Sequence, residues 1–385
     1  MRIAILGPTY PYRGGISQHT MLLAHHLRTA HDVTLVTFSR QYPAWLYKGR
    51  TDQDPSDASP ATAEAGERLL DPLNPLTWWR TARRIRAAWP HIVVIPWWVP
   101  FWAPSVATVA GLVRRWTGAE VIFLCHNVLP HDGGNLLDRT LTRAALRWGT
   151  GFIVHAETDA GALRRLVPDQ ATEGRVARTL LPAFTLAPPA DRAAARSALA
   201  VPEGACVALF FGFVRPYKGL AVLLDAMPAV LAAVPNAYLL VAGEFWAPAA
   251  HFQARAARLG IADRVRFDDR YIPNEAVGPY FAAADVVVQP YLEASQSAVV
   301  SLAVDLGVPV VASRVGGLPE AVAEGVSGLT VVPGDPALLA AALVRVFTEP
   351  GMLARLRHGT AEARARFGWE HTVAAIEGLG RHKAG

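Results

Sequence analysis

The sequence contains little cysteine and little charge. Two of its 385 residues are cysteines, Cys125 and Cys206, and each lies in an apolar run without a C-x-x-C partner. This pattern argues against a disulfide framework or a zinc site and fits the reducing cytoplasm, where we expect the protein. Charged residues make up 18% and hydrophobic residues 52%, a composition that excludes a disordered chain. The apolar run after Arg2 is also too short for a signal peptide.

The common nucleotide-binding fingerprints are missing from the loop after the first apolar run. This loop, "GPTYPYRGGISQHT", has neither the G-x-G-x-x-G spacing of dinucleotide-binding proteins nor the G-x-x-x-x-G-K-[ST] of a P-loop. A dinucleotide oxidoreductase is therefore disfavoured. Gly14 and Gly15 still stand where a backbone can approach a ligand closely, although a plain tight turn would use the same glycines.

The chain is mildly basic, with a formal charge of +5. This balance suits an anionic small ligand or an anionic membrane surface, and peripheral contact with a membrane is an expectation. The charge is too diffuse to predict a nucleic-acid partner.

Residues 92–113 are uncharged over a length that a membrane span would need. Three prolines interrupt the stretch, which therefore predicts a buried strand followed by a helix with a basic end. We expect Trp97, Trp98 and Trp102 to be exposed, either at a membrane interface or lining an acceptor cleft.

Short β-branched runs alternate with helical stretches along the whole chain. Such alternation, with nearly continuous apolar strands, predicts an α/β fold of parallel, doubly wound sheets. The alternation pauses at residues 180–204, which are rich in proline and alanine. We expect one domain over residues 1–187, a second over 188–365, and a C-terminal helix over 366–385 that packs back towards the first.

The stretch "FFGFVRPYKGL" places two cations directly after a buried strand and before a helix. Arg215 and Lys218 therefore stand at the carboxyl end of a parallel strand, where open sheets bind ligands. Free amides at the helix start add positive potential, and the pair matches a diphosphate. The alternative is a solvated pair of loop residues.

Two further strand ends carry polar residues. His126 and His131 lie in "FLCHNVLPHD" without the further spaced ligands that a metal site would need. His126 is therefore a better candidate for a neutral hydrogen-bond partner of substrate than for a metal ligand. The alternative is that "HN" only caps the local structure. The loop Glu293–Ser297 opens a helix, so its amides and side chains can bind an anion or hydroxyls, or Ser can simply cap the helix. The acidic pair at Asp52–Asp54 lies in a polar loop, and we expect no metal there.

The order of "GGISQHT", "FGFVRPYKGL", "VAGE", "GVPVVASRVGGLPE" and "FGWE" resembles the retaining glycosyltransferases of the GT-B fold, glycosyltransferase family 4. The resemblance covers nearly the whole chain and is strongest to a subgroup with RPYKG and ASQS motifs. It implies two Rossmann-like domains facing across a cleft. It also implies metal-independent transfer of a hexosyl group, with retention, from a UDP- or GDP-sugar to a glycan, lipid-linked or small-molecule acceptor, without a cofactor, as in polysaccharide biosynthesis.

The resemblance also implies roles for individual residues. Arg215 and Lys218 would neutralise the donor diphosphate, and His126 would hydrogen-bond the transferred sugar. The implied donor-binding residues are Gly14, Gly15, Tyr271, Ile272, Glu293, Ser295, Gln296 and Ser297. Trp97, Trp98 and His131 are the implied acceptor residues.

One departure from the family concerns its E-x7-E motif, whose two glutamates would fall at Ala294 and Leu302. Glu293 is displaced by one position, and Ser295 and Gln296 are the available substitutes. A catalytically inactive glycosyltransferase-like subunit is therefore one alternative. A sugar-nucleotide epimerase of the same fold is another, although it would need acid–base carboxylates that the sequence scarcely offers.

Overall fold

The structure is a computed structural model that describes residues 1–43, 50–56, 66–130, 134–184 and 190–381. His131 and the expected domain boundary near residue 188 lie outside these residues. The chain divides into two compact units. The first unit comprises Met1–Asp54, Ser59–Phe184 and Gly368–Gly385, and the second comprises Pro55–Ala58 and Thr185–Phe367.

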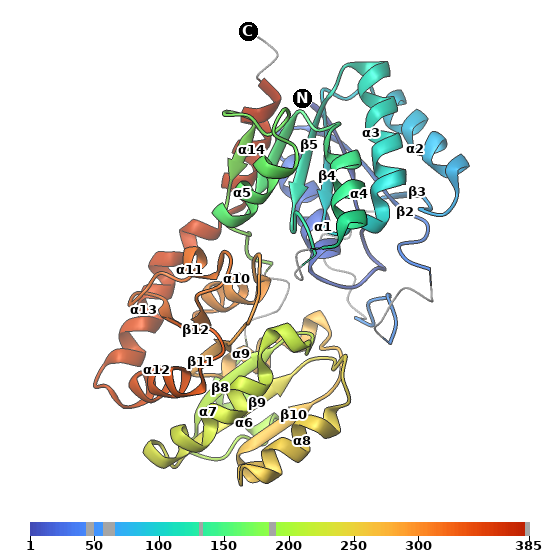
Figure 1. Ribbon diagram of the computed structural model, residues 1–385. Helices are drawn as coiled ribbons and strands as arrows, with labels where there is room; N and C mark the ends of the chain where they lie inside the picture. The colour runs from blue at the N-terminus through green and yellow to red at the C-terminus, as the bar shows by residue number, and fades with distance from the viewer. Residues whose placement is uncertain (44–49, 57–65, 131–133, 185–189, 382–385) are drawn as a thin grey trace. The chain divides into compact units, whose positions relative to one another are not determined.

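The first unit is built on a parallel seven-stranded sheet with the order β3-β2-β1-β4-β5-β6-β7 (Figure 1). Helices α2, α3 and α4 lie together on one face, while α14 packs against β5, β6 and β7 and contacts α1 on the other. Its strands are β1 (Arg2–Leu6), β2 (Asp32–Phe38), β3 (Glu67–Leu70), β4 (Ile92–Trp97), β5 (Glu120–Cys125), β6 (Gly151–Val154) and β7 (Val176–Arg178). Its helices are α1 (Gly15–Arg28), α2 (Pro75–Ala87), η1 (Pro100–Trp102), α3 (Ala103–Thr117), α4 (Leu136–Leu146), α5 (Glu157–Leu166) and α14 (Trp369–Arg381).

The second unit contains a parallel six-stranded sheet with the order β10-β9-β8-β11-β12-β13. Its strands are β8 (Cys206–Phe211), β9 (Ala237–Ala242), β10 (Val265–Asp268), β11 (Val286–Gln289), β12 (Val310–Ser313) and β13 (Gly328–Val331). Its helices are α6 (Arg192–Ala198), η2 (Pro216–Lys218), α7 (Leu220–Ala233), α8 (Ala249–Arg258), η3 (Ala262–Arg264), α9 (Asn274–Ala283), α10 (Ala298–Asp305), α11 (Leu318–Ala321), α12 (Pro336–Thr348), α13 (Met352–Arg364) and η4 (Ala365–Phe367). The prediction of two doubly wound, Rossmann-like domains is confirmed.

Each sheet reverses its strand order once, between β1 and β4 in the first unit and between β8 and β11 in the second. At such a point the helices that follow the two strands pack on opposite faces of the sheet. The loops at the carboxyl ends of these strands therefore diverge and leave a crevice between them. The fold therefore places the loops after β1, β8 and β11 where open α/β sheets bind ligands.

The stretch 92–113 forms β4, η1 and the start of α3, as its prolines predict. The expectation that Trp97 and Trp102 are exposed is wrong, because each is only 2% exposed. Helices cover both faces of the sheet, so every residue of β4 is buried. Trp102 packs on Phe38, with ring centroids 4.0 Å apart, and Trp98 is half-buried.

Candidate functional site

The loop that follows β8 is fixed by the loop that follows β11. Gly219 has a φ of +70°, and a Cβ there would lie 1.9 Å from the carbonyl oxygen of Pro290, so no other residue fits without displacing the backbone. The amide of Leu292 donates to the carbonyl oxygen of Tyr217 at 2.7 Å. These contacts hold the turn Gly212–Gly219 in one position at the carboxyl edge of the sheet.

Arg215 lies on this turn and stacks on an aromatic ring. Its Cζ is 3.6 Å from the centroid of Trp246, which follows β9. Its Nε is buried and has no hydrogen-bond partner among the described residues. Stacking holds a guanidinium in place by its flat face and leaves its N–H groups free to meet an anion in the ring plane.

Lys218 lies one turn further on, with Nζ 5.3 Å from the centroid of Tyr291. No ion pair joins it to a carboxylate in the part of the chain that the structure describes. Burial, and then the charge of Arg215, lower the pKa of Lys218 to about 7. Two neighbouring cations without a carboxylate are costly to hold together, and an arriving anion would relieve that cost.

The Glu293–Ser297 loop lies at the carboxyl end of β11. Ser297 caps α10, since its Oγ accepts from the amide of Val299 at 3.3 Å, and it donates to Oε1 of Gln289 at 2.8 Å. The capping alternative is therefore confirmed for the side chain of Ser297. Glu293 is exposed and Gln296 is half-buried, so both are accessible to a ligand.

The adjoining Gly-Gly loop closes on this one through backbone contacts. The amide of Gly317 donates to the carbonyl oxygen of the buried Ser295 at 2.8 Å, and a Cβ on Gly316 would lie 1.6 Å from the carbonyl oxygen of Ala294. The loops after β8, β11 and β12 thus form one packed edge.

An aromatic group lies beside Arg215. The ring of Phe213 has its centroid 5.7 Å from that of Trp246 and 6.0 Å from that of Tyr271. Ile272 is buried, with 6% of its surface exposed. The suggested role of Tyr271 and Ile272, main-chain bonds to a base, stays a prediction, but the aromatic faces give a base a surface to stack on.

In the first unit, α1 begins at the glycine pair. Gly14 has a φ of +107°, no side chain caps the helix, and a Cβ on Gly14 would meet nothing within 4 Å. Among the described residues the space around Gly14 is therefore open, and Gly15 is exposed. The uncapped first turn of α1 offers backbone N–H groups and positive potential to an anion.

Three histidines gather beside the carboxyl ends of β5 and β6. His126 follows β5, His155 follows β6, and His19 comes from α1. The ring centroid of His126 lies 4.7 Å from that of His19 and 5.4 Å from that of His155. Both ring nitrogens of the fully buried His19, and Nε2 of His126, have no hydrogen-bond partner among the described residues.

Burial keeps these histidines neutral. It lowers the pKa of His19 and of His126 well below the usual value, and the neighbouring histidines lower both further. Burial also lowers the pKa of His155 to about 4. The hydrogen bond from its Nδ1 to the carbonyl oxygen of Thr179 at 3.1 Å acts in the opposite direction and raises this pKa. The neutral state expected for His126 is therefore the one that its surroundings favour, and its free Nε2 can exchange a hydrogen bond with a hydroxyl.

The predicted acceptor residues do not form a set. Trp97 is part of the core, and its Nε1 donates to the carbonyl oxygen of Val128 at 3.4 Å, so its proposed contact with an acceptor is wrong. The Nε1 of Trp98 donates to the hydroxyl of Tyr42 at 2.9 Å. A role for Trp98 stays a prediction, and His131 lies outside the described residues.

Sequence reasoning missed Trp246, His19 and His155. Trp246 follows a strand just as Arg215 does, so a systematic search of strand ends would have found it, and the same holds for His155. His19 gives no such signal, because only the fold brings the second turn of α1 against the ends of β5 and β6.

Metal ligands do not gather in the described ranges, which hold no group of three or more His, Cys, Asp or Glu side chains able to bind an ion. The carbonyl oxygen of Asp52 accepts from the amide of Arg13 at 2.9 Å, so this acidic loop packs along the glycine-rich loop through its backbone.

Two protein families match the chain. Residues 14–178 match the family described as "Glycosyl transferase 4-like domain", and residues 205–349 match "Glycosyl transferases group 1". D-inositol 3-phosphate glycosyltransferase 2 of Catenulispora acidiphila is 38% identical over 234 residues, which are 58% of this chain and 54% of that protein. The D-inositol 3-phosphate glycosyltransferase of Streptomyces avermitilis is 39% identical over 196 residues, 49% of this chain and 42% of that one. The chain thus spans about half the length of these curated relatives.

Solved structures share the fold over almost the whole chain. Sucrose-phosphate synthase of Thermosynechococcus elongatus has a TM-score of 0.72 at 22% identity, covering 99% of this chain and 97% of that one. Anabaena Alr3699/HepE in complex with UDP-glucose has a TM-score of 0.73 at 18% identity and covers 98% of each chain. With both halves matched in order and the GT-B arrangement of strands in each unit, the chain belongs to the GT-B glycosyltransferases of family 4.

Proposed function

We propose that the protein is a retaining, metal-independent glycosyltransferase that moves a hexosyl group from a UDP- or GDP-sugar to a glycan, lipid-linked or small-molecule acceptor. The observation that carries the proposal is the pair Arg215 and Lys218, held at the carboxyl end of β8 without a carboxylate partner among the described residues. Such a pair is suited to the diphosphate of a sugar nucleotide.

The chemistry that we propose uses these charges most in the transition state. The bond between the anomeric carbon and the β-phosphate oxygen breaks as the acceptor hydroxyl oxygen bonds to the same carbon. Negative charge grows on the leaving diphosphate, where Arg215 and Lys218 stabilise it, and this phosphate takes the hydroxyl proton. Attack from the face that the phosphate leaves gives retention, and cations supplied by the protein replace a divalent metal.

The other predicted residues have supporting roles in this proposal. Gly14 and Gly15, at the uncapped start of α1, would offer backbone N–H groups to the donor, and the half-buried, neutral His126 would contact a sugar hydroxyl. Phe213, Trp246 and Tyr271 form the surface for the base. Both free cysteines are consistent with a cytoplasmic setting.

The test begins with the donor. Isothermal titration of the full chain with UDP, GDP and ADP, each with and without EDTA, should give binding of one nucleotide that EDTA leaves unchanged. UDP comes first, because the Anabaena structure holds UDP-glucose. An Arg215→Ala variant that bound as tightly as wild type would refute the diphosphate assignment.

Turnover then separates an enzyme from an inactive homologue. The anomeric configuration of the product, followed by proton NMR with the donor that binds, should equal that of the donor. Binding without hydrolysis or transfer to any of a panel of glycan and lipid-linked acceptors would favour the inactive subunit, in line with Ala294 and Leu302 at the glutamate positions of the family.

A further inference from the structure

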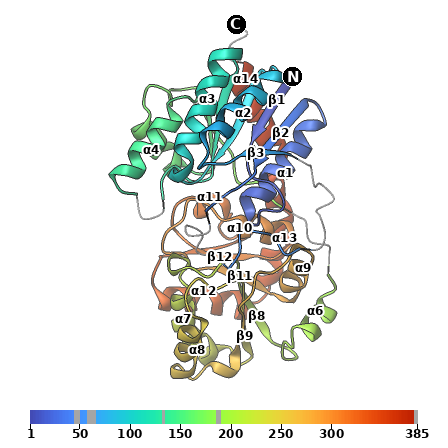
Figure 2. The ribbon, with the colours of Figure 1, turned by 90° about the vertical axis from the view of Figure 1, so that its right-hand side faces the viewer.

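Helices α2, α3 and α4 form one surface layer of the first unit. α3 packs between α2 and α4 (Figures 1 and 2). Helices that connect parallel strands run antiparallel to them, so the amino-terminal ends of all three lie towards the carboxyl edge of the sheet. We refer to the outward side of these helices as the α2–α4 face.

The positive charge of the protein is concentrated on this face. Residues 72–149 contain nine arginines against three acidic residues, so this stretch alone has a formal charge of +6, compared with +5 for the whole chain. The small net charge of the whole chain suggested that its positive charge is spread over the protein. Instead, the excess positive charge is concentrated in this segment. Arg84 forms a hydrogen bond with Glu67. The exposed arginines are Arg80, Arg83, Arg86, Arg114, Arg115, Arg139, Arg143 and Arg147.

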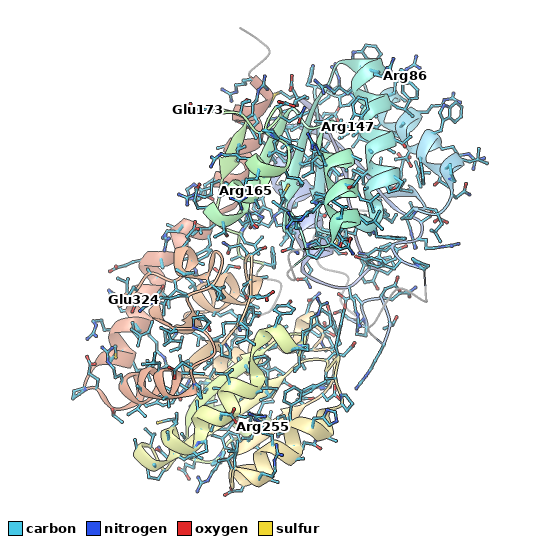
Figure 3. The ribbon with its side chains drawn as sticks, in the orientation of Figure 1. Arg86, Arg147, Arg165, Glu173, Arg255 and Glu324 are labelled. Carbon is cyan, nitrogen blue, oxygen red and sulfur yellow. The ribbon has the colours of Figure 1, made fainter. Side chains whose placement is uncertain are left out.

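These eight arginines form no ion pair with a carboxylate of the described residues. The acidic side chain that α4 does carry, Asp138, is used inside the fold, where it accepts from the amide of Asn135 at 3.0 Å. Three of the guanidinium groups lie over tryptophan rings. The Cζ of Arg83 is 4.6 Å from the centroid of Trp79, that of Arg86 is 5.5 Å from Trp116, and that of Arg147 is 5.3 Å from Trp148. Figure 3 labels Arg86 and Arg147 on this layer.

Large apolar side chains are exposed on the same face. Leu136 and Leu137 are 81% and 64% exposed at the start of α4, and Leu76 is 69% exposed at the start of α2. Trp79 follows one turn later, and it is 48% exposed. Scattered single cases are normal on a protein surface. Here half of the twelve exposed large hydrophobic residues of the described chain fall between residues 73 and 137.

The fold does not need these side chains. α4 begins with a capping box formed by Asn135 and Asp138, and it packs inwards through Thr142, Ala145 and Leu146. α2 begins at Pro75, capped by the side chain of Asn74. Polar residues at the exposed positions would serve both helices equally well, so the apolar residues point to a contact outside the chain.

We propose that the α2–α4 face docks on an anionic lipid bilayer. Guanidinium groups bind lipid phosphates in a bidentate manner, and leucine and tryptophan enter the boundary between headgroups and acyl chains. The apolar positions lie at the starts of two helices on either side of α3 and are therefore spread over the face, which suits a fluid surface better than a compact protein partner. A nucleic acid would use the arginines but would gain little from exposed leucines.

This assignment moves the membrane contact away from Trp97 and Trp102, which are buried, to the two helices on either side of α3. It rests on surface charge and exposure, and so it is independent of the proposed transferase activity.

The test is co-sedimentation of the full chain with vesicles of phosphatidylcholine, alone or with about 30% phosphatidylglycerol, at roughly 0.1 M and 0.5 M NaCl. We expect strong binding only with phosphatidylglycerol at the lower salt concentration. Leu136→Ser with Leu137→Ser should weaken binding roughly tenfold, because both residues insert into the bilayer. Arg139→Glu with Arg143→Glu should abolish the preference for the anionic lipid.

Matched changes in the second unit provide the controls. Leu338 is 46% exposed on α12 and Arg258 is exposed on α8, so Leu338→Ser and Arg258→Glu should bind vesicles like wild type. Equal melting temperatures of all variants would show that the fold is intact. The proposal is overturned if wild type does not prefer anionic vesicles, or if the α4 variants bind like the controls.

Two other outcomes would assign the face to a different partner and so also overturn the proposal. One is tight binding of an RNA oligonucleotide with no binding of vesicles. The other is self-association in sedimentation velocity that Leu136→Ser with Leu137→Ser removes while vesicle binding stays unchanged.

Discussion

Both units have polar residues at the carboxyl ends of their strands, but these residues are charged in the second unit and neutral in the first. In the second unit Arg215 and Lys218 are half-buried on the turn after β8, and no ion pair with a described carboxylate neutralises them. In the first unit His19 and His155 are fully buried and His126 is half-buried, and desolvation keeps all three neutral. The same topology thus gives one sheet edge with uncompensated positive charge and one lined by neutral histidines.

Removing the stacked guanidinium should give the largest effect. In the proposed mechanism, Arg215→Ala deletes a charged donor that binds the diphosphate most strongly in the transition state. We expect turnover to fall roughly 100- to 1,000-fold and UDP affinity to fall roughly tenfold. Steady-state kinetics and calorimetry measure the two effects. Arg258→Ala, which changes an exposed arginine of the same unit, should match wild type in both.

Acid should weaken the first unit through its histidines. A group whose pKa is lowered by folding takes up protons first in the unfolded state, so stability is complete above about pH 6.5 and falls as the pH drops. With a folded pKa of about 4, His155 alone accounts for roughly 3 kcal/mol of unfolding free energy between pH 6.5 and pH 4.

His155→Asn provides the control for this pH dependence. Asparagine keeps a donor for the carbonyl oxygen of Thr179 but does not titrate. Urea unfolding at pH 7.5, 5.5 and 4.5 should therefore show a flatter dependence in the variant than in wild type. Equal slopes would show that His155 is not protonated on unfolding in this range.

Much of this arrangement could be predicted from sequence because it depends on local patterns. The run "CVALFFGFV" followed by "RPYKG" predicts the strand, the turn and the helix that place Arg215, and the structure has all three. The prolines of residues 92–113 likewise predict a strand and a helix. In both cases the backbone rules act over a few residues, so no information about distant parts of the chain is needed.

Side-chain surroundings were less predictable because they depend on packing between distant segments. Trp97 looked exposed in a proline-rich stretch, but the neighbouring strands and the helices on both faces bury it. Trp246 meets Arg215 only because β8 and β9 are adjacent in the sheet. His19 meets His126 only because the fold brings the second turn of α1 against the residues that follow β5 and β6. These pairings therefore depend on the fold, although a search of strand ends would have singled out Trp246 and His155 as candidates.

A substitution of Lys218 tests more directly whether the cations at the carboxyl edge of the second sheet bind the diphosphate. Because it is partly desolvated beside Arg215 and no described carboxylate pairs with it, its charge costs stability in the free protein. Lys218→Met should weaken UDP binding roughly tenfold while leaving the melting temperature equal to or above that of wild type. If Lys218 only stabilised the fold, the variant would have a lower melting temperature than wild type and an unchanged affinity for UDP.

The pH dependence of nucleotide binding is the smallest of these effects. With a pKa of about 7, Lys218 is largely protonated at pH 6 and largely neutral at pH 8 in the free protein. A diphosphate attracts the protonated form and raises the pKa in the complex, so binding above pH 7 takes up a proton. UDP affinity should therefore fall above pH 7, by no more in total than the roughly tenfold expected for Lys218→Met. Calorimetry at pH 6.5 and 8.5, in buffers of different ionisation enthalpy, measures both the affinity and the proton uptake. Lys218→Met should bind with the same affinity at both values, and a variant that kept the wild-type dependence would assign the proton to a different group.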